Sequence, residues 1–374
     1  MLLHATKQSQ INNRKRLLPK AWDPAFDNHL TRNHKVIILV MSFRTGSTFM
    51  GELFNQNPDI LYDFEPFHIG GLKNKRRKGL YKGEHLRHTE DELNMLYLQQ
   101  ILHNCSMINN AFGKLLHKHW CCGNDPEENM ELFGHETCDE NTSRDPSQVR
   151  SIRQYFCKKR NAVALKVIRL RRLKDLELIK NIHEADVRVI HVLRDPRGMF
   201  GSRSGFPDIF YAMKYQLRWT THEDEWQKLA LEAQSECEKF IRDIEYAENS
   251  LWLKNRYLQV KYGEMAKNYQ TVVKNIYEFI GEQLPRAVIE HLKISVNAAE
   301  VSNLSPKNNA DRGGALDTFK NSTEVNEKWL QWKINRIRLV DKNCHLFIKK
   351  MNWPFMNDHE NRNFEFLPER KQDF

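Results

Sequence analysis

The chain has 374 residues, of which 40% are hydrophobic, and its formal net charge is +10. This length suits one large α/β domain or two smaller ones, with enough apolar residues for a core. No run approaches the ~18 apolar residues that span a bilayer. No zinc-finger spacing or aromatic and basic RNA motif occurs, so the sequence disfavours a membrane-spanning or nucleic-acid-binding protein.

The predicted strands and helices alternate along the chain. Residues 1–34 are polar and basic, and we expect them to form a stem or linker before a single domain at 35–374. Apolar runs predict strands at 36–41, 59–64, 162–168, 187–193 and 257–262. Helical spacing predicts helices at 91–103, 173–182, 215–253 and 265–280, and others beginning at 49, 196 and 323. This alternation predicts an α/β three-layer sandwich, with a central parallel sheet flanked by helices.

The turn after the first strand has the features of an anion site. A strand that runs directly into a helix points free backbone N–H groups and the positive end of the helix dipole at one spot, which favours phosphate. Arg44 adds a fixed charge, and nearby hydroxyls add donors. The turn lacks the second glycine and the lysine of a Walker A motif. The alternative to an anion site is an ordinary turn that connects a strand to a helix. The candidate residues are Ser42, Phe43, Arg44, Thr45, Gly46, Ser47, Thr48 and Phe49.

A second anion site is predicted after the fourth strand. Arg194 follows the strand, Pro196 suits the first turn of a helix, and Ser202 lies two turns further on the same side. Arg194 and Ser202 can therefore bind a second phosphate group together. The alternative is a surface arginine paired with Asp195. Because ligands of parallel sheets bind beyond the carboxyl ends of the strands, we expect Arg44, Glu65 and Arg194 to share one site.

These motifs resemble those of sulfotransferases that use 3′-phosphoadenosine 5′-phosphosulfate (PAPS). The first turn resembles their 5′-phosphosulfate loop, and an arginine at position 44, where cytosolic members carry lysine, is similar to the Golgi carbohydrate branch. The second motif resembles their 3′-phosphate motif, which implies that Arg194 and Ser202 hold the 3′-phosphate of PAPS. The resemblance implies the sulfotransferase fold, which is P-loop-like.

The resemblance extends over about residues 35–356 and is to the Golgi galactose, N-acetylgalactosamine (GalNAc) and N-acetylglucosamine (GlcNAc) 6-O-sulfotransferases. Residues 165–171 look like their central strand, and residues 260–265 like the end of a later strand, with Gly263 a departure. Residues 321–344 are similar to their tryptophan-containing C-terminal helix and late cysteine. The family implies an acidic or neutral glycan acceptor of the poly-lactosamine or glycosaminoglycan type, and the Golgi lumen. Its N-terminal membrane helix is lacking here, so we expect membrane attachment only through an upstream anchor.

Sulfuryl transfer needs fixed positive charge at the leaving oxygens and a base for the attacking hydroxyl. Arg44 and the amides at 46–48 fit the first role, and no metal ion is required. Glu65, which ends the second strand, is the candidate base, because related carbohydrate sulfotransferases use a glutamate at a comparable place. The alternative is that Glu65 caps a helix or pairs with a nearby arginine, and His68 is the reserve base. Lys166 and Arg169 either approach the sulfate or glycan or form a buried pair.

Cysteines and glycosylation signals favour a secretory compartment. Five of the seven cysteines fall between Cys105 and Cys157, which fits disulfides in an oxidising lumen better than cytosolic thiols. Four Asn-x-Ser/Thr sequons add moderate support; they lie at Asn104, Asn141, Asn303 and Asn321. The basic run at 73–78 is either a binding patch or a solvated loop.

Two other functions remain as alternatives to a sulfotransferase. One is a P-loop-type kinase or other nucleotide transferase, against which the missing Walker lysine and the lack of a clear Mg²⁺-binding aspartate argue. The other is a catalytically silent glycan-binding protein that uses its basic face. Trp329 and Trp332, three residues apart on a predicted helix, are expected in the core rather than at a sugar platform.

Overall fold

The computed structural model describes residues 34–65, 98–99, 102, 157, 160–180, 185–204, 222–296 and 326–356. All of them belong to one compact unit, His34–Phe374. Outside them lie almost all of the expected stem, His68, the basic run at 73–78, the four sequons and the cysteines from 105 to 138. The division into a stem and one catalytic domain stays a prediction.

The described strands form one parallel sheet, in the order β2-β3-β1-β4-β5. Their bounds are β1 His34–Val40, β2 Ile60–Phe64, β3 Ala162–Val167, β4 Ala185–Leu193 and β5 Tyr257–Lys261. Each lies within two residues, at either end, of a strand predicted from an apolar run. The parallel sheet is therefore confirmed.

β1 occupies the centre of the sheet because it is apolar on both faces. Every side chain from Val36 to Val40 is at most 1% exposed. Val36, Ile38 and Val40 pack into the core on one face, whereas Ile37 and Leu39 pack into the core on the other. An unbroken apolar run is what a strand covered on both faces requires.

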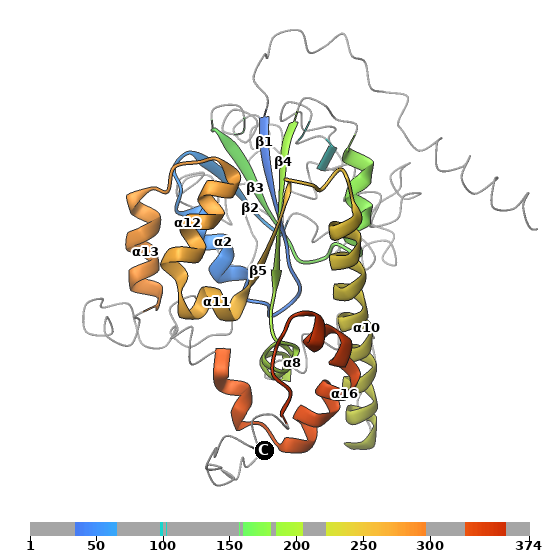
Figure 1. The fold of residues 1–374 in the computed structure, drawn as a ribbon. Helices are drawn as coiled ribbons and strands as arrows, with labels where there is room; N and C mark the ends of the chain where they lie inside the picture. The colour runs from blue at the N-terminus through green and yellow to red at the C-terminus, as the bar shows by residue number, and fades with distance from the viewer. Residues whose placement is uncertain are drawn as a thin grey trace, which may run out of the picture. The chain divides into compact units, whose positions relative to one another are not determined.

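Helices cover both faces of the sheet (Figure 1). One face carries α2 Ser47–Asn55, α11 Tyr262–Lys267, α12 Tyr269–Ile280 and α13 Arg286–Val296. The 3-10 helix η3 Leu173–Ile179 and the long helix α10 His222–Asn249 lie on the other. A further group packs beyond the carboxyl ends of the strands, and it comprises α8 Pro196–Ser204, η4 Lys328–Gln331 and α16 Ile334–Lys350. The predicted three-layer sandwich is confirmed.

Several helices differ from the prediction. The helix expected at 265–280 is interrupted at Asn268, which has φ −140° and begins α12 as a preferred N-cap residue type. Within the helix predicted at 173–182, residues 173–179 form a 3-10 helix, and residues 181–182 lie outside the described part. α13 was not predicted, although Pro285 directly before it is a helix-start signal. Of the helix expected at 91–103, only Leu98, Gln99 and Leu102 are described, and all three are helical.

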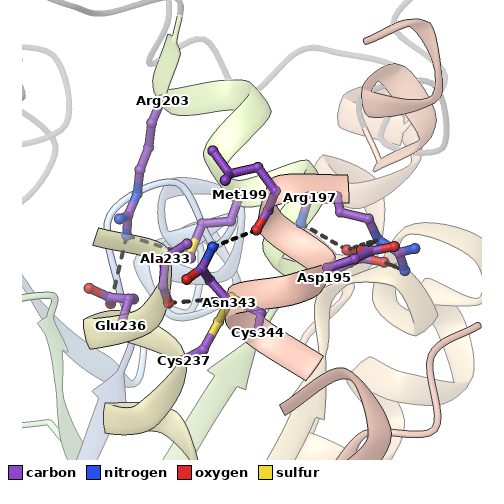
Figure 2. Close-up of a disulfide and its surroundings, with 11 residues drawn as sticks. Asp195, Arg197, Met199, Arg203, Ala233, Glu236, Cys237, Asn343 and Cys344 are labelled. Atoms are coloured by element: carbon purple, nitrogen blue, oxygen red, sulfur yellow. Dashed lines mark hydrogen bonds and ion pairs between the residues drawn. A yellow bond between two sulfur atoms is a disulfide. The ribbon is translucent and has the colours of Figure 1, made fainter. Parts of the chain in front are cut away.

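A disulfide between Cys237 and Cys344 joins α10 to α16 (Figure 2). It bridges 107 residues of sequence, and closing so long a loop typically stabilises a domain by about 2–4 kcal/mol, mainly through the unfolded state. Cys157 is disulfide-bonded too. Disulfides are thus confirmed, although the sequence did not assign this pair. Trp329 and Trp332 pack in the core next to α16, as predicted.

His191 is a buried, neutral histidine in the middle of β4. Its Nδ1 lies 2.9 Å from the Tyr257 hydroxyl, and Phe240 packs beside the ring. Burial, and secondarily the charge of Lys239, lowers the pKa of His191 to about 3. The charged form is therefore excluded from the folded protein at ordinary pH.

This buried histidine predicts a loss of stability in acid. Between about pH 6.5 and 3 the unfolded state binds a proton at His191 that the folded state does not, so the unfolding free energy falls as pH falls. We expect about 3 kcal/mol of such loss between pH 6.5 and 4. His191→Gln removes this titration, and urea unfolding at both pH values should show a shallower pH dependence in the variant. Equal dependences would contradict the prediction.

Candidate active site

Charged side chains line the carboxyl edge of the sheet in the same order as the strands. Glu65 follows β2, Lys166 and Arg169 lie at and after the end of β3, Arg44 follows β1, and Arg194 follows β4. With Ser202 of α8, they form what we call the edge cluster: Glu65, Lys166, Arg169, Arg44, Arg194 and Ser202. The structure thus brings Arg44, Glu65 and Arg194 to one edge, as the topology predicted.

The loop after β1 has a backbone conformation that its sequence makes specific. Gly46 has φ +87°, and a Cβ at this position would overlap the ring of Tyr262. Glycine is therefore required both by the backbone conformation and by the close approach of Tyr262, the first residue of α11. The hydroxyl of Thr45 donates to the Ser42 carbonyl oxygen at 2.7 Å, which closes the turn.

The start of α2 is free for an anion. Its N-cap is Gly46, no side chain caps it, and its first turn contains no acidic residue. Backbone N–H groups at an uncapped helix start carry the positive end of the helix dipole. The helix begins at Ser47, two residues earlier than predicted, so Ser47 and Thr48 lie in its first turn and Phe49 points into the core.

α8 starts differently, because an acidic residue caps it. Asp195 accepts hydrogen bonds from the backbone N–H of Arg197 at 2.9 Å and from its guanidinium at 2.7 Å. The Arg197 guanidinium also lies 4.2 Å from the ring centroid of Trp329 and 3.6 Å, Nε to Oδ1, from Asp341 of α16. The hydrogen bonds of Asp195 thus go to Arg197 and the helix start, whereas Arg194 donates to the Arg44 carbonyl oxygen. The predicted position of Pro196 in the first turn is confirmed.

Two arginines from different motifs meet at the centre of the edge cluster. Arg194 Nη1 donates to the Arg44 carbonyl oxygen at 3.0 Å, and its guanidinium lies 4.7 Å from the ring centroid of Tyr262. Arg44 Nε donates to the Ser202 hydroxyl at 2.8 Å. Ser202, predicted to act with Arg194, therefore contacts Arg44. The two predicted phosphate sites adjoin each other.

The electrostatics of this pair favour a bound anion. Burial and then the charge of Arg194 lower the pKa of Arg44, against a smaller opposing effect of Tyr262. Burial likewise lowers the pKa of Arg194, with Tyr262 and Asp195 opposing it. A lowered pKa means that the folded protein disfavours each positive charge. A phosphate or sulfate group between the two guanidinium groups would relieve that cost.

Glu65 is held between two cations, Lys166 in β3 and Arg169 two residues after its end. Arg169 Nη1 lies 2.7 Å from Glu65 Oε2, and Lys166 Nζ lies 3.4 Å from Oε1. Lys166, which is 1% exposed, also reaches the Thr48 hydroxyl of α2 at 3.5 Å. The structure therefore shows Glu65 paired with an arginine, the alternative to a role as a base. Lys166 thus links the Glu65 carboxylate to the first turn of α2.

Arg44 and Glu65 both have an unusual backbone conformation. In the described part of the chain, the non-glycine residues with positive φ are Arg44, Glu65, Asn255 and Asn352. Asparagine adopts this conformation comparatively often, whereas arginine and glutamate rarely do. Unfavourable backbone conformations tend to persist at functional sites. Arg44 at φ 67° and Glu65 at φ 48° are both residues proposed for chemistry from the sequence.

Two residues near the site were not singled out from the sequence. Tyr262 contacts both Gly46 and Arg194, and its position directly after β5 is the signal that could have found it. Glu236 of α10 accepts a hydrogen bond from the Ser42 hydroxyl across 194 residues of sequence, for which no local pattern exists. In the described residues, no cluster of His, Cys, Asp and Glu could hold a metal ion. Nor is any helix there long and apolar enough to cross a membrane.

A parallel α/β sheet whose carboxyl edge presents an uncapped helix and buried arginines is typical of enzymes that bind phosphorylated ligands. Comparison with known proteins defines the class further. The sulfotransferase domain family matches residues 34–331, so the chain belongs to the sulfotransferase family. This membership confirms the resemblance read from the motifs, and it makes the chain an enzyme of the sulfotransferase class with the sulfotransferase fold.

Similar proteins cover most of the chain at low identity. Carbohydrate sulfotransferase 1 of Mus musculus is 24% identical over 369 residues, which cover 90% of this chain and 83% of the relative. Carbohydrate sulfotransferase 3 of Homo sapiens is 26% identical over 372 residues, which cover 89% of this chain and 71% of the relative. Among solved structures, mouse sulfotransferase SULT7A1 complexed with PAP is 14% identical and has a TM-score of 0.41, covering 89% of this chain and 90% of that chain.

Proposed function

We propose that this chain transfers the sulfuryl group of PAPS to the 6-hydroxyl of a galactose, GalNAc or GlcNAc unit in a glycan. The observation that carries the proposal is the edge cluster: four cations and one carboxylate beside an uncapped helix, in a chain of the sulfotransferase family. The names of two relatives, both carbohydrate sulfotransferases, support a carbohydrate acceptor. Membership of the sulfotransferase family supports a sulfate donor, for which we propose PAPS.

In this proposal the donor, when bound, supplies an activated sulfuryl group on a phosphate leaving group. Arg44 and the backbone N–H groups at the start of α2 bind the 5′-phosphosulfate and stabilise the negative charge that grows on the bridging and leaving oxygens. Arg194 and Ser202 hold the 3′-phosphate. The contact between Arg44 and Ser202 is consistent with one ligand that carries both groups.

Glu65 is the proposed base for the acceptor. Its carboxylate takes the proton of the sugar hydroxyl as the hydroxyl oxygen bonds to sulfur and the bond from sulfur to the phosphate oxygen breaks. Lys166 lies between Glu65 and Thr48, at 3.4 Å and 3.5 Å, and so can contact the group in transit. Arg169 fixes the other carboxylate oxygen. The pairing of Glu65 then orients the base instead of replacing its role.

We also propose a luminal Golgi location, as the resemblance implies. The disulfide between α10 and α16 supports an oxidising compartment. The four sequons are consistent with it.

The direct test measures radiolabelled sulfate transfer from PAPS to keratan, chondroitin and GlcNAc-terminated acceptors, each paired with its 6-deoxy analogue. We expect label on at least one acceptor and none on its 6-deoxy partner. Transfer to both members of a pair would contradict the 6-position. Binding of the desulfated nucleotide PAP without transfer to any acceptor would mean that the donor is right and the acceptor wrong. If the protein neither binds PAP nor transfers sulfate, the proposal is overturned. Turnover of ATP would favour a kinase.

A further inference from the structure

The loop that precedes Arg44 is held from outside the sheet by the long helix α10. The Ser42 hydroxyl donates a hydrogen bond to Glu236 Oε1. Glu236 Oε1 also lies 3.7 Å from Arg203 Nη2 of α8, and Figure 2 shows these two side chains facing each other. One carboxylate thus contacts both the phosphate-binding loop and the helix that carries Ser202.

Arg203 also holds the loop that precedes Arg44. Its Nε donates to the Phe43 carbonyl oxygen at 3.1 Å, and its guanidinium lies 4.8 Å from the ring centroid of Phe200. Arg203 is only 5% exposed, so its charge is kept in place by Glu236 and by these packing contacts. The side chain of Ser42 and the carbonyl of Phe43 are therefore both fixed directly before Arg44.

Glu236 is itself anchored by its neighbours on α10. The next residue, Cys237, forms the disulfide with Cys344 of α16. The Cys344 Sγ also contacts the Ala233 carbonyl oxygen, one turn before Glu236, at 3.3 Å. The helical turn that presents the carboxylate is tied covalently to the C-terminal helix.

A carboxylate near a site for a polyanion repels the ligand, so its presence needs a reason. Arg44 sits at φ 67°, a conformation that an arginine does not keep without support from its surroundings. The contacts of Glu236 and Arg203 supply that support on the two residues before it. We propose that Glu236 is a positioning residue, which acts through Ser42 and Arg203 to hold the donor loop in its anion-binding conformation. The expected effect on donor affinity rests on the proposed function.

The test uses Glu236→Ala, the conservative Glu236→Gln and the matched control Glu238→Ala. Glu238 lies on the same helix, is half exposed, and bonds only to α10 residues among its described contacts, Gln234 and Arg242. We expect Glu236→Ala to raise the Kd for PAP at least tenfold and the KM for PAPS in parallel, with the acceptor KM within twofold of wild type. For Glu236→Gln, the Kd for PAP and the KM for PAPS should lie between those of wild type and Glu236→Ala, because the glutamine amide oxygen still accepts the hydrogen bond from Ser42.

Hydrogen exchange supplies a readout that does not depend on the reaction. Amides of residues 42–49 should exchange at least tenfold faster in Glu236→Ala than in Glu238→Ala, with a smaller effect in Glu236→Gln. Equal exchange and equal PAP affinity in the Glu236 variants and the control would overturn the proposal. If wild type binds no PAP, the proposed function fails, and the exchange rates alone then decide whether Glu236 positions the loop. If Glu236→Ala does not fold, the near-isosteric Glu236→Gln decides both points.

Discussion

Replacing Arg44 by glycine is expected to lower kcat/KM for sulfuryl transfer by about 10²–10³-fold, without lowering the stability of the ligand-free protein by more than about 1 kcal/mol. The activity falls because the fixed charge at the start of α2 is lost. Stability is maintained because glycine adopts φ 67° freely, and because burial, and secondarily the charge of Arg194, disfavour the charge of Arg44. Steady-state kinetics together with urea unfolding measure both quantities on the same preparation.

Arg44→Lys is the matched control for charge. It keeps a cation and the positive φ, but it loses the hydrogen bond from Arg44 Nε to the Ser202 hydroxyl. We expect its activity to lie between those of wild type and Arg44→Gly, with the larger part of the loss in the KM for PAPS. A fully active Arg44→Gly would exclude Arg44 from the reaction. A variant that loses activity only in proportion to lost folding would show that Arg44 has a structural role alone.

Glu65→Gln is expected to lower kcat by about 10²–10⁴-fold, the range that a general base contributes. The amide keeps the shape of the side chain but cannot take a proton. Affinity for PAP should be unchanged or slightly higher, because a negative charge near the donor is removed. Single-turnover kinetics with saturating donor isolate the chemical step, and calorimetry measures PAP binding.

The second role that the structure allows for Glu65 is an anchor for Lys166 and Arg169, and a partner variant separates the two roles. Arg169→Met breaks the 2.7 Å ion pair but leaves the carboxylate and its contact with Lys166. If Glu65 is the base, Arg169→Met should retain at least a tenth of the wild-type kcat while Glu65→Gln does not. Equal losses of kcat in the two variants would assign Glu65 to the anchor role. His68 would then be the base to test.

The fold was predictable because its signals are local. β1 contains an unbroken apolar run, the other strands are short segments rich in apolar residues, and the alternation with helices predicts a parallel sheet. The same topology placed Arg44, Glu65 and Arg194 at one edge, since each directly follows a strand. The interruption at Asn268 was missed because apolar spacing continues across it, so periodicity alone does not reveal the break.

The contacts that organise the site were not predictable in the same way. Ser202 bonds to Arg44 across 158 residues, and Ser42 bonds to Glu236 across 194. No pattern in a single sequence indicates which side chains meet at such separations. For that reason the sequence allows two roles for Lys166 and Arg169, and only the placement of β2 beside β3 shows that both reach Glu65. The pairing of Cys237 with Cys344 was equally outside the reach of spacing arguments.

The position of β1 has a consequence for how the protein is made. β1 is translated first of the five described strands, but its two neighbours in the sheet, β3 and β4, are encoded more than a hundred residues later. At a synthesis rate of ~5–20 residues per second, this strand, whose residues 36–40 are all apolar, waits on the order of ten seconds for either partner. An unpaired strand of this composition is prone to aggregate, and parallel pairing over such distances is slow. β1 is therefore open to aggregation on the nascent chain until the segments of β3 or β4 have been made.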